Sequence, residues 1–321
     1  MAATKPEPGA EAEPDTSPAS AKREPGLLTP PSGSFFRLTD IPEDIWSLAN
    51  FGFEGTGKSL WVMKNMPTPM MVANLDRPIT RAHLGMLPRE RAEGIFIRNL
   101  RENGYDEALD SSTACNIRDD IEMMVSTNLK WLKGGTFLLD GGTMYRDVLK
   151  YSDPVIGGKL ESGRRFNPKD KASINNYVAN LMSYIQDQGI NFAITAHAAF
   201  SWEMKKVMVG EELKDQLTRT KTVYPKADDI VFERSNLVLL MFKRCQCGKN
   251  LVTQDGTCTA ITDSQDPRAE EGHQGRRHVT RIVTNKFNTA TEGTVWEDLT
   301  GETLHILCEN PKKAAALMAS N

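Results

Sequence analysis

The sequence predicts an α/β fold with a mostly parallel central sheet covered by helices on both faces. From Trp46 onward, short apolar runs alternate with segments of helical periodicity, the pattern of strands joined by crossover helices. A glycine-rich loop lies between the first apolar run and the first helical pattern. The chain of 321 residues, 39% hydrophobic and 25% charged, has ordinary globular composition and can bury one substantial core.

The expected elements follow from where each apolar run begins and ends. The first strand is expected at Ser47 to Phe53, and the following helix, from Leu60 to Asn65, stops at Pro67. The other strands are expected at Met70 to Leu75, Gly94 to Leu100, Thr136 to Asp140, Asn191 to His197, Asn236 to Lys243 and His278 to Phe287. Long helices are expected around Ile117 to Leu132 and from Ala172 to Gln188.

The chain is expected to contain one main domain with a tail at each end. Residues 1–34 are rich in Pro, Ala, Glu and Ser and almost free of apolar side chains, which predicts a disordered tail. We expect the domain to span residues 35–310 and to end in a β extension. A polar insert at 245–277 is expected to leave the sheet edge, and residues 311–321 form a C-terminal tail with a short helix.

Charge and hydropathy exclude several classes of protein. The net charge of −3 gives no global attraction to nucleic acid, so contact with a polyanion would need local basic segments. No run reaches the roughly 18 apolar residues of a spanning helix, and the N-terminus lacks a signal pattern. Five cysteines, an odd number, suit a reducing compartment. We therefore expect a cytoplasmic protein, in the host if it is viral, without a membrane partner.

The glycine-rich loop has the spacing of a Walker A motif. Glycines let successive backbone N–H groups converge on phosphate oxygens, and the following helix adds its N-terminal dipole. We expect Lys58 to reach the outer phosphates and the Ser59 hydroxyl to bind magnesium. The residues expected to bind ATP are Gly52, Phe53, Glu54, Gly55, Thr56, Gly57, Lys58 and Ser59.

A Walker B pattern follows further along the chain. Residues 137–140, Phe-Leu-Leu-Asp, place Asp140 at the carboxyl end of a buried strand, where an acidic group can approach the magnesium ion. An aspartate that ends a strand is also a common turn former. The order of the two motifs favours the metal-binding role, so ATP and Mg²⁺ are the expected cofactors.

The order of these elements resembles the RecA-like P-loop ATPases, and most of all the core-only RecA-type recombinases and single-strand annealing proteins of bacteriophages. The resemblance covers roughly residues 46–300. It implies that Asp76, after the second strand, is a general base, in the place of the family's usual Glu. It also implies that His197, where RecA has a glutamine, is a polar sensor of the γ-phosphate. The alternatives are a turn aspartate and a packing histidine.

The resemblance further implies head-to-tail assembly of identical subunits, in a ring or a filament, with ATP between neighbours. Lys286 stands where the family has an Arg that reaches the neighbour's nucleotide. A lysine keeps the charge but loses the planar fork of a guanidinium. The alternative is a solvated lysine on an edge strand.

Two mobile loops carry single-stranded DNA in the RecA fold, and long basic segments occupy both places here. Single-stranded DNA is thus an expected partner, together with a single-strand-binding protein, although basic loops are often merely solvated. In the segment Gly157 to Lys171 the candidate residues are Lys159, Arg164, Arg165, Phe166, Lys169 and Lys171. In the segment Phe200 to Lys226 they are Phe200, Trp202, Lys205 and Lys206.

The cysteines of the insert raise the question of a zinc site. Cys245, Cys247 and Cys258, with His273 or His278 as a fourth ligand, provide the donor types of a tetrahedral Zn²⁺ site. Only one residue separates the first two cysteines, whereas structural zinc sites usually place at least two between them. We favour free thiols over zinc.

Three functions remain in competition. The first is an ATP-hydrolysing protein that acts on single-stranded DNA in recombination, annealing or replication. The second is a P-loop kinase of a small molecule or nucleotide, which would need a compact acceptor pocket and an Arg-rich lid. The third is a translocating or packaging motor subunit with a nearly identical nucleotide core. DNA-stimulated hydrolysis without translocation would distinguish the first from the others.

Overall fold

The structure, a computed structural model, describes residues 45–101, 109–209, 212–227, 229–245, 250–251 and 275–320. The predicted tail of residues 1–34 lies outside this part of the chain. The strands are β1 (Ser47–Gly52), β2 (Met70–Asn74), β3 (Ile95–Asn99), β4 (Thr136–Asp140), β5 (Asn191–Val209), β6 (Glu212–Pro225), β7 (Leu237–Cys245), β8 (Asn250–Leu251), β9 (Gly275–Asn285) and β10 (Val295–Glu297).

Helices connect most of these strands, as the periodicity predicts. They are α1 (Lys58–Asn65), α2 (Arg81–Leu84), α3 (Arg89–Glu93), α4 (Ser111–Leu132), α5 (Gly142–Ser152), α6 (Pro154–Glu161), α7 (Pro168–Asp187), α8 (Asp229–Arg234), α10 (Gly301–Glu309) and α11 (Pro311–Ser320), with a 3₁₀ turn at Thr289–Thr291. The short helix expected in the C-terminal tail is therefore present as α11.

The central sheet has the strand order β10-β9-β7-β1-β5-β4-β2-β3. The pairs from β7 to β3 are parallel, whereas β9 and β10 pair antiparallel beyond β7. Because β5 lies between β1 and β4, the two strands that carry the Walker motifs are separated by the strand that contains His197. The carboxyl ends of all these parallel strands meet at one edge of the sheet.

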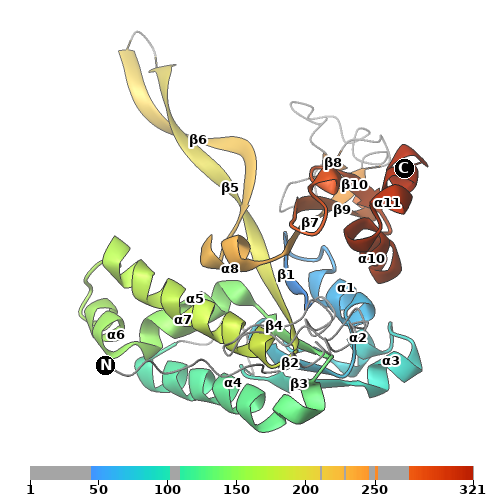
Figure 1. Cartoon of the computed structure of the whole chain (residues 1–321). Helices are drawn as coiled ribbons and strands as arrows, with labels where there is room; N and C mark the ends of the chain where they lie inside the picture. Colours follow the sequence, from blue (N-terminus) through green and yellow to red (C-terminus); the bar gives the residue numbers. More distant parts are fainter. Residues whose placement is uncertain are drawn as a thin grey trace, which may run out of the picture. The chain divides into compact units, whose positions relative to one another are not determined.

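Alternate side chains of the strands enter two separate apolar clusters. In β4, Phe137 and Leu139 face one cluster and Leu138 faces the other. Side chains of α4, α5 and α7 complete the first cluster, and those of α1 and α10 complete the second. Figure 1 shows α4, α5 and α7 grouped together, apart from α1 and α10. A strand buried on both faces needs this continuous apolar character. The structure confirms the predicted fold class, an α/β fold with a mostly parallel sheet, helices on both faces and a C-terminal β extension.

The second basic segment forms a long hairpin. β5 leaves the parallel sheet after His197 and pairs antiparallel with β6, from Ala198↔Pro225 to Val209↔Glu212. Figure 1 shows this hairpin extending away from the helices. The prediction of a loop from Phe200 to Lys226 is therefore wrong, because most of the segment forms two strands that satisfy each other's backbone hydrogen bonds.

The first basic segment is largely helical. Asp153 caps α6 by accepting hydrogen bonds from the backbone N–H groups of Val155 and Ile156, and Asn167 caps α7. Each cap is followed by a proline, which suits the first turn of a helix. The prediction of a loop from Gly157 to Lys171 is therefore wrong, since only residues 162–167 connect the two helices.

Candidate functional site

The glycine-rich loop joins the carboxyl end of β1 to the first residue of α1. Gly55 and Gly57 adopt φ angles of 72° and 79°, the left-handed region that glycine occupies without strain. Gly52 is needed for a different reason. A Cβ there would lie 2.3 Å from the carbonyl oxygen of Met241 in β7, so no larger residue fits without displacing that strand. Left-handed glycines of this kind allow a loop to direct successive backbone N–H groups at a phosphate.

Lys58 begins α1 and lies almost wholly inside the loop. Its side chain is buried, and its Nζ donates a hydrogen bond of 3.0 Å to the carbonyl oxygen of Phe53. Burial lowers the pKa of the Lys58 ammonium, although three nearby carboxylates act in the opposite direction. The ammonium is therefore directed into the loop, where a bound phosphate could replace the Phe53 carbonyl as its partner.

Ser59 and Asp140 bring the two Walker motifs into direct contact. The Ser59 hydroxyl donates a hydrogen bond of 2.6 Å to Oδ1 of Asp140, and the Thr195 hydroxyl donates to the same oxygen. Burial raises the pKa of the Asp140 carboxyl, although these two hydrogen bonds act in the opposite direction. A hydroxyl and a carboxylate at this separation are hard oxygen ligands of the kind that Mg²⁺ prefers, so the residues fit that ion.

Asp76 and His197 form a second pair, although 121 residues separate them in the chain. Nε2 of His197 lies 3.1 Å from Oδ2 of Asp76 and donates to it, because a carboxylate only accepts. Burial acts to raise the pKa of Asp76, but the hydrogen bond and charge of His197 help to lower it below its usual value. The backbone N–H of His197 also donates to the Thr143 hydroxyl oxygen, at 3.1 Å. The sequence placed both residues at strand ends but did not predict that they touch.

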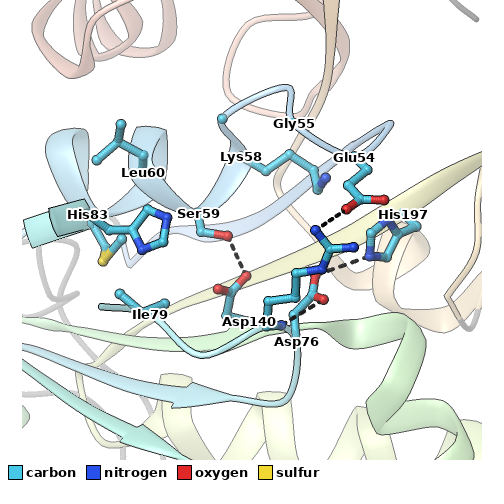
Figure 2. Close-up of a pocket in the computed structure, with 13 residues that line it drawn as sticks. Glu54, Gly55, Lys58, Ser59, Leu60, Asp76, Ile79, His83, Asp140 and His197 are labelled. Carbon is cyan, nitrogen blue, oxygen red and sulfur yellow. Dashed lines mark hydrogen bonds and ion pairs between the residues drawn. The ribbon is translucent and has the colours of Figure 1, made fainter. Parts of the chain in front are cut away.

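One pocket of about 340 Å³ contains both pairs (Figure 2). Lys58 and Ser59 come from the side of the loop and α1, and Asp76, Asp140 and His197 lie across from them. The lining residues that the sequence analysis missed are Leu60, Met63, Arg77, Ile79 and His83. Their only sequence signal is proximity to the Walker A loop or to Asp76, which does not show which side chains turn inward.

A histidine from the C-terminal extension also contacts the loop. Nδ1 of His278, in β9, donates a hydrogen bond of 2.8 Å to the carbonyl oxygen of Thr56. β9 reaches the loop through its register with β7, in which His278 pairs with Lys243. The sequence analysis considered His278 only as an alternative zinc ligand, because nothing local connects it to a loop 222 residues earlier.

The zinc hypothesis stays untested. Cys247, Cys258 and His273 lie outside the described residues, as does the side chain of Cys245. Within the described residues, no group of three or more His, Cys, Asp or Glu side chains could hold a metal ion.

Lys286 lies at the opposite end of the sheet from the loop. It follows Asn285, which pairs with Leu237 at the start of β7, whereas the loop follows the carboxyl end of β1. Its Nζ donates a hydrogen bond of 2.5 Å to the carbonyl oxygen of Glu233. Lys286 therefore cannot bind the nucleotide of its own chain, and a role towards a neighbouring subunit stays a prediction.

Several predicted DNA contacts of the first basic segment have partners within the chain. Lys159 pairs with Asp170 at 2.7 Å, Lys171 pairs with Asp229, and Phe166 packs under the Lys150 ammonium at 5.4 Å. Lys159 and Phe166 are half-buried against the helices, whereas Lys171 forms an exposed ion pair. Their DNA contact stays a prediction. Arg164, Arg165 and Lys169 are exposed.

The hairpin also differs from a simple DNA loop at its base. The ring of Phe200 packs against Phe53 of the Walker A loop, with ring centroids 5.1 Å apart. Phe200 thus supports the loop and is not a free stacking surface. Lys206 is exposed, and the side chains of Trp202 and Lys205 lie outside the described residues.

Comparisons with known proteins do not assign this chain to a family. No protein-family model and no curated protein matches the sequence. Among solved structures, the crystal structure of a KaiC-like protein from the hyperthermophilic archaeon Pyrococcus horikoshii is similar at 11% identity and a TM-score of 0.38, over 78% of this chain and 84% of that chain. So distant a similarity does not bear on activity. None of the helices described in the structure combines the length and the hydropathy that spanning a bilayer requires.

Proposed function

We propose that this protein binds and hydrolyses ATP in the pocket between the Walker A loop, the ends of β2 and β4, and His197 of β5. The observation that supports this best is the 2.6 Å hydrogen bond between Ser59 and Asp140 beside the buried Lys58. Residues 81 positions apart meet there in an arrangement that a turn former or a solvated loop does not require. The same contact serves a nucleotide site directly, because both oxygens can bind one ion.

Different groups of the chain would bind the phosphates, the magnesium ion and the nucleoside. Backbone N–H groups of the loop and the N-terminus of α1 would hold the β- and γ-phosphates, and Lys58 would exchange its Phe53 carbonyl for phosphate oxygens. Ser59 and Asp140 would hold magnesium, which supplies charge neutralisation on the phosphates when bound. The apolar end of the pocket, at Leu60, Met63 and Ile79, suits the nucleoside.

Asp76 is the candidate to activate the attacking water. Its lowered pKa keeps it ionised at neutral pH, so that it can orient water and accept a proton. A carboxylate with a low pKa is a weak base, and its contribution would therefore lie mainly in positioning. His197, already bonded to Asp76, is placed to respond when a γ-phosphate arrives.

The finer proposal is that hydrolysis is coupled to single-stranded DNA in recombination, annealing or replication, in a homo-oligomer. Its support is the continuity of β5, which runs from His197 in the pocket into the hairpin, and the packing of Phe200 on Phe53. The cations Arg164, Arg165, Lys169 and Lys206 are exposed and would provide phosphate contacts. Lys286, exposed at the far end of the sheet, is the candidate to reach a neighbour's nucleotide.

Measuring ATP hydrolysis by the full chain, with and without magnesium and single-stranded DNA, tests both levels of the proposal. We expect magnesium-dependent hydrolysis that single-stranded DNA stimulates. Hydrolysis that DNA leaves unchanged would remove the DNA role but keep the ATPase. Phosphate transfer to a small acceptor, or ATP-driven movement along duplex DNA, would favour the kinase or the motor.

A further inference from the structure

Arg77 is the one arginine among the described residues that line the pocket, and the Walker motifs do not account for it. It follows Asp76 directly, and its NH1 lies 2.8 Å from Oε1 of Glu54 in the Walker A loop. The pair therefore connects the two sides of the pocket entrance, from the loop after β1 to the segment after β2. Neither residue supports the core, since their side chains are 79% and 52% exposed.

The backbone of Arg77 is held, while its side chain is able to move. Its N–H donates a hydrogen bond of 2.9 Å to Oδ1 of Asp76, which ties the Cα to the candidate water-activating carboxylate. The guanidinium, by contrast, is bound through an exposed ion pair, and such pairs contribute little free energy. A guanidinium also prefers the bidentate hydrogen bonds that a phosphate offers. Exchanging Glu54 for phosphate therefore costs little and gains a stronger contact.

The charge of the pocket favours the same exchange. Its described lining contains three carboxylates, Glu54, Asp76 and Asp140, against two basic side chains other than histidine, Lys58 and Arg77. A nucleotide with magnesium adds further negative charge. Lys58 would serve the phosphates held by the loop, which leaves Arg77 for charge at the outermost phosphate.

We propose that Arg77 is a phosphate-binding residue that acts within its own chain on the terminal phosphate, and that Glu54 restrains it until a nucleoside triphosphate enters. This inference rests on the proposed ATP-binding function. Arg77 swings from Glu54 to the γ-phosphate, which ADP lacks. The Glu54–Arg77 pair thereby lets the pocket distinguish the triphosphate from the diphosphate.

The test is to titrate the full chain with magnesium-ADP and with a non-hydrolysable magnesium-ATP analogue. We expect Arg77→Ala to weaken binding of the analogue by about tenfold and of ADP by less than about twofold. Arg77→Lys should fall between, because it keeps the charge without the fork. Arg89→Ala is the matched control, since Arg89 forms an exposed pair with Glu93 outside the pocket lining.

The role of Glu54 is tested by a double-mutant cycle. Glu54→Gln should tighten binding of the analogue by about two- to threefold in the wild-type background and have no effect in the Arg77→Ala background. Equal losses for both nucleotides in Arg77→Ala, or a gain from Glu54→Gln that persists without Arg77, would overturn the proposal and leave the ATP site standing. A wild-type chain that binds neither nucleotide would overturn the proposed function itself.

Discussion

The nucleotide pocket and the two basic segments are both rich in charged residues, yet the sequence predicted them with very different success. In the pocket, Lys58, Ser59, Asp76, Asp140 and His197 all lie together as their positions after strands suggest. In the basic segments, the predicted loops are two helices and a hairpin. Fixed spacing encodes backbone geometry, whereas a high content of lysine and arginine is compatible with any exposed conformation.

The first basic segment, Gly157 to Lys171, and the residues just before it contain local signals for helix starts. Asp153-Pro154 and Asn167-Pro168 each combine a side chain that caps a helix with a proline suited to its first turn. Asp170 completes a capping box with Asn167. Local cap chemistry was therefore a better guide to these residues than their charge.

The largest effect is expected from Lys58→Ala. The substitution removes a buried ammonium directed into the loop and should weaken ATP binding or turnover by at least about 100-fold. Lys64→Ala, an exposed lysine on the same helix, is the control and should leave both unchanged. Equilibrium binding and steady-state hydrolysis are the measurements. If the Lys58 variant binds and hydrolyses ATP like the wild type, the pocket is not the ATP site.

Asp140→Asn should lower magnesium-dependent hydrolysis by about 100-fold, because an amide is a poor ligand for the ion. The Asn side chain can still accept the Ser59 and Thr195 hydrogen bonds, so the fold should persist. The measurement is hydrolysis as a function of magnesium concentration. An unchanged magnesium dependence would return Asp140 to the role of a turn former.

The same substitution should change how stability depends on pH. Burial raises the folded-state pKa of Asp140 above its unfolded value, so the folded chain holds the proton more tightly. The favourable contribution of this group is present below the unfolded pKa, about 3.9, and is lost as the pH rises through the folded pKa. At neutral pH the wild-type chain carries the cost of a buried, ionised Asp140, and an asparagine in its place cannot ionise. The unfolding temperature of the Asp140→Asn variant at neutral pH should therefore equal or exceed the wild-type value. A clear decrease would contradict this account.

Asp76→Asn should slow hydrolysis by about 10- to 100-fold while ATP still binds. Stability against unfolding is a separate property of this carboxyl. Because the pKa of Asp76 is lowered in the folded chain, its ionised form stabilises the fold above the unfolded pKa, and this stabilisation is lost as the pH falls through the folded pKa. Single-turnover hydrolysis with saturating ATP isolates the chemical step. If that rate equals the wild-type rate, Asp76 serves only to hold His197.

His197→Ala should leave ATP and single-stranded DNA able to bind but remove most of their mutual enhancement. His197 forms a hydrogen bond with Asp76 in the pocket, and its strand, β5, continues into the hairpin. A change at the γ-phosphate can therefore reach the hairpin through His197. A typical coupling is roughly 1 to 3 kcal/mol, and it must be the same in both directions. Titrating labelled DNA with an ATP analogue and with ADP, at one salt concentration, measures it. A variant that keeps the full difference would show that another residue is the sensor.

The smallest effect is expected from the double substitution Arg164→Ala and Arg165→Ala. Two lost phosphate contacts should lower affinity for single-stranded DNA at every sequence and reduce the slope of log affinity against log salt by about 1.4. The double substitution Lys312→Ala and Lys313→Ala removes a neighbouring pair of exposed lysines from α11 and is the control. Equal losses in both variants would indicate a nonspecific effect of charge.

Much of the sheet could be predicted from the sequence because each parallel strand is a short, continuous apolar run. β4 has the predicted bounds, and β1, β2 and β3 each end within one residue of theirs. β5 was predicted only as far as His197, since its continuation is polar and its partner, β6, defines it as a strand. A strand that is buried on both faces has a continuous apolar run, which can be recognised in the sequence. A strand that is held only by pairing with another segment has no such run.

By itself the sequence determined the Walker A loop, the helix after it and the strand that ends in Asp140. In those elements, backbone geometry follows from neighbouring residues: glycines at left-handed positions, an apolar run and a carboxylate at its end. Only the tertiary structure decided which distant side chains share the pocket. His278 reaches the loop through strand register, Asp76 meets His197 because β2 and β5 both flank β4, and Arg77 faces Glu54 across the entrance. Such contacts depend on the order of strands in the sheet, which no local pattern of residues specifies.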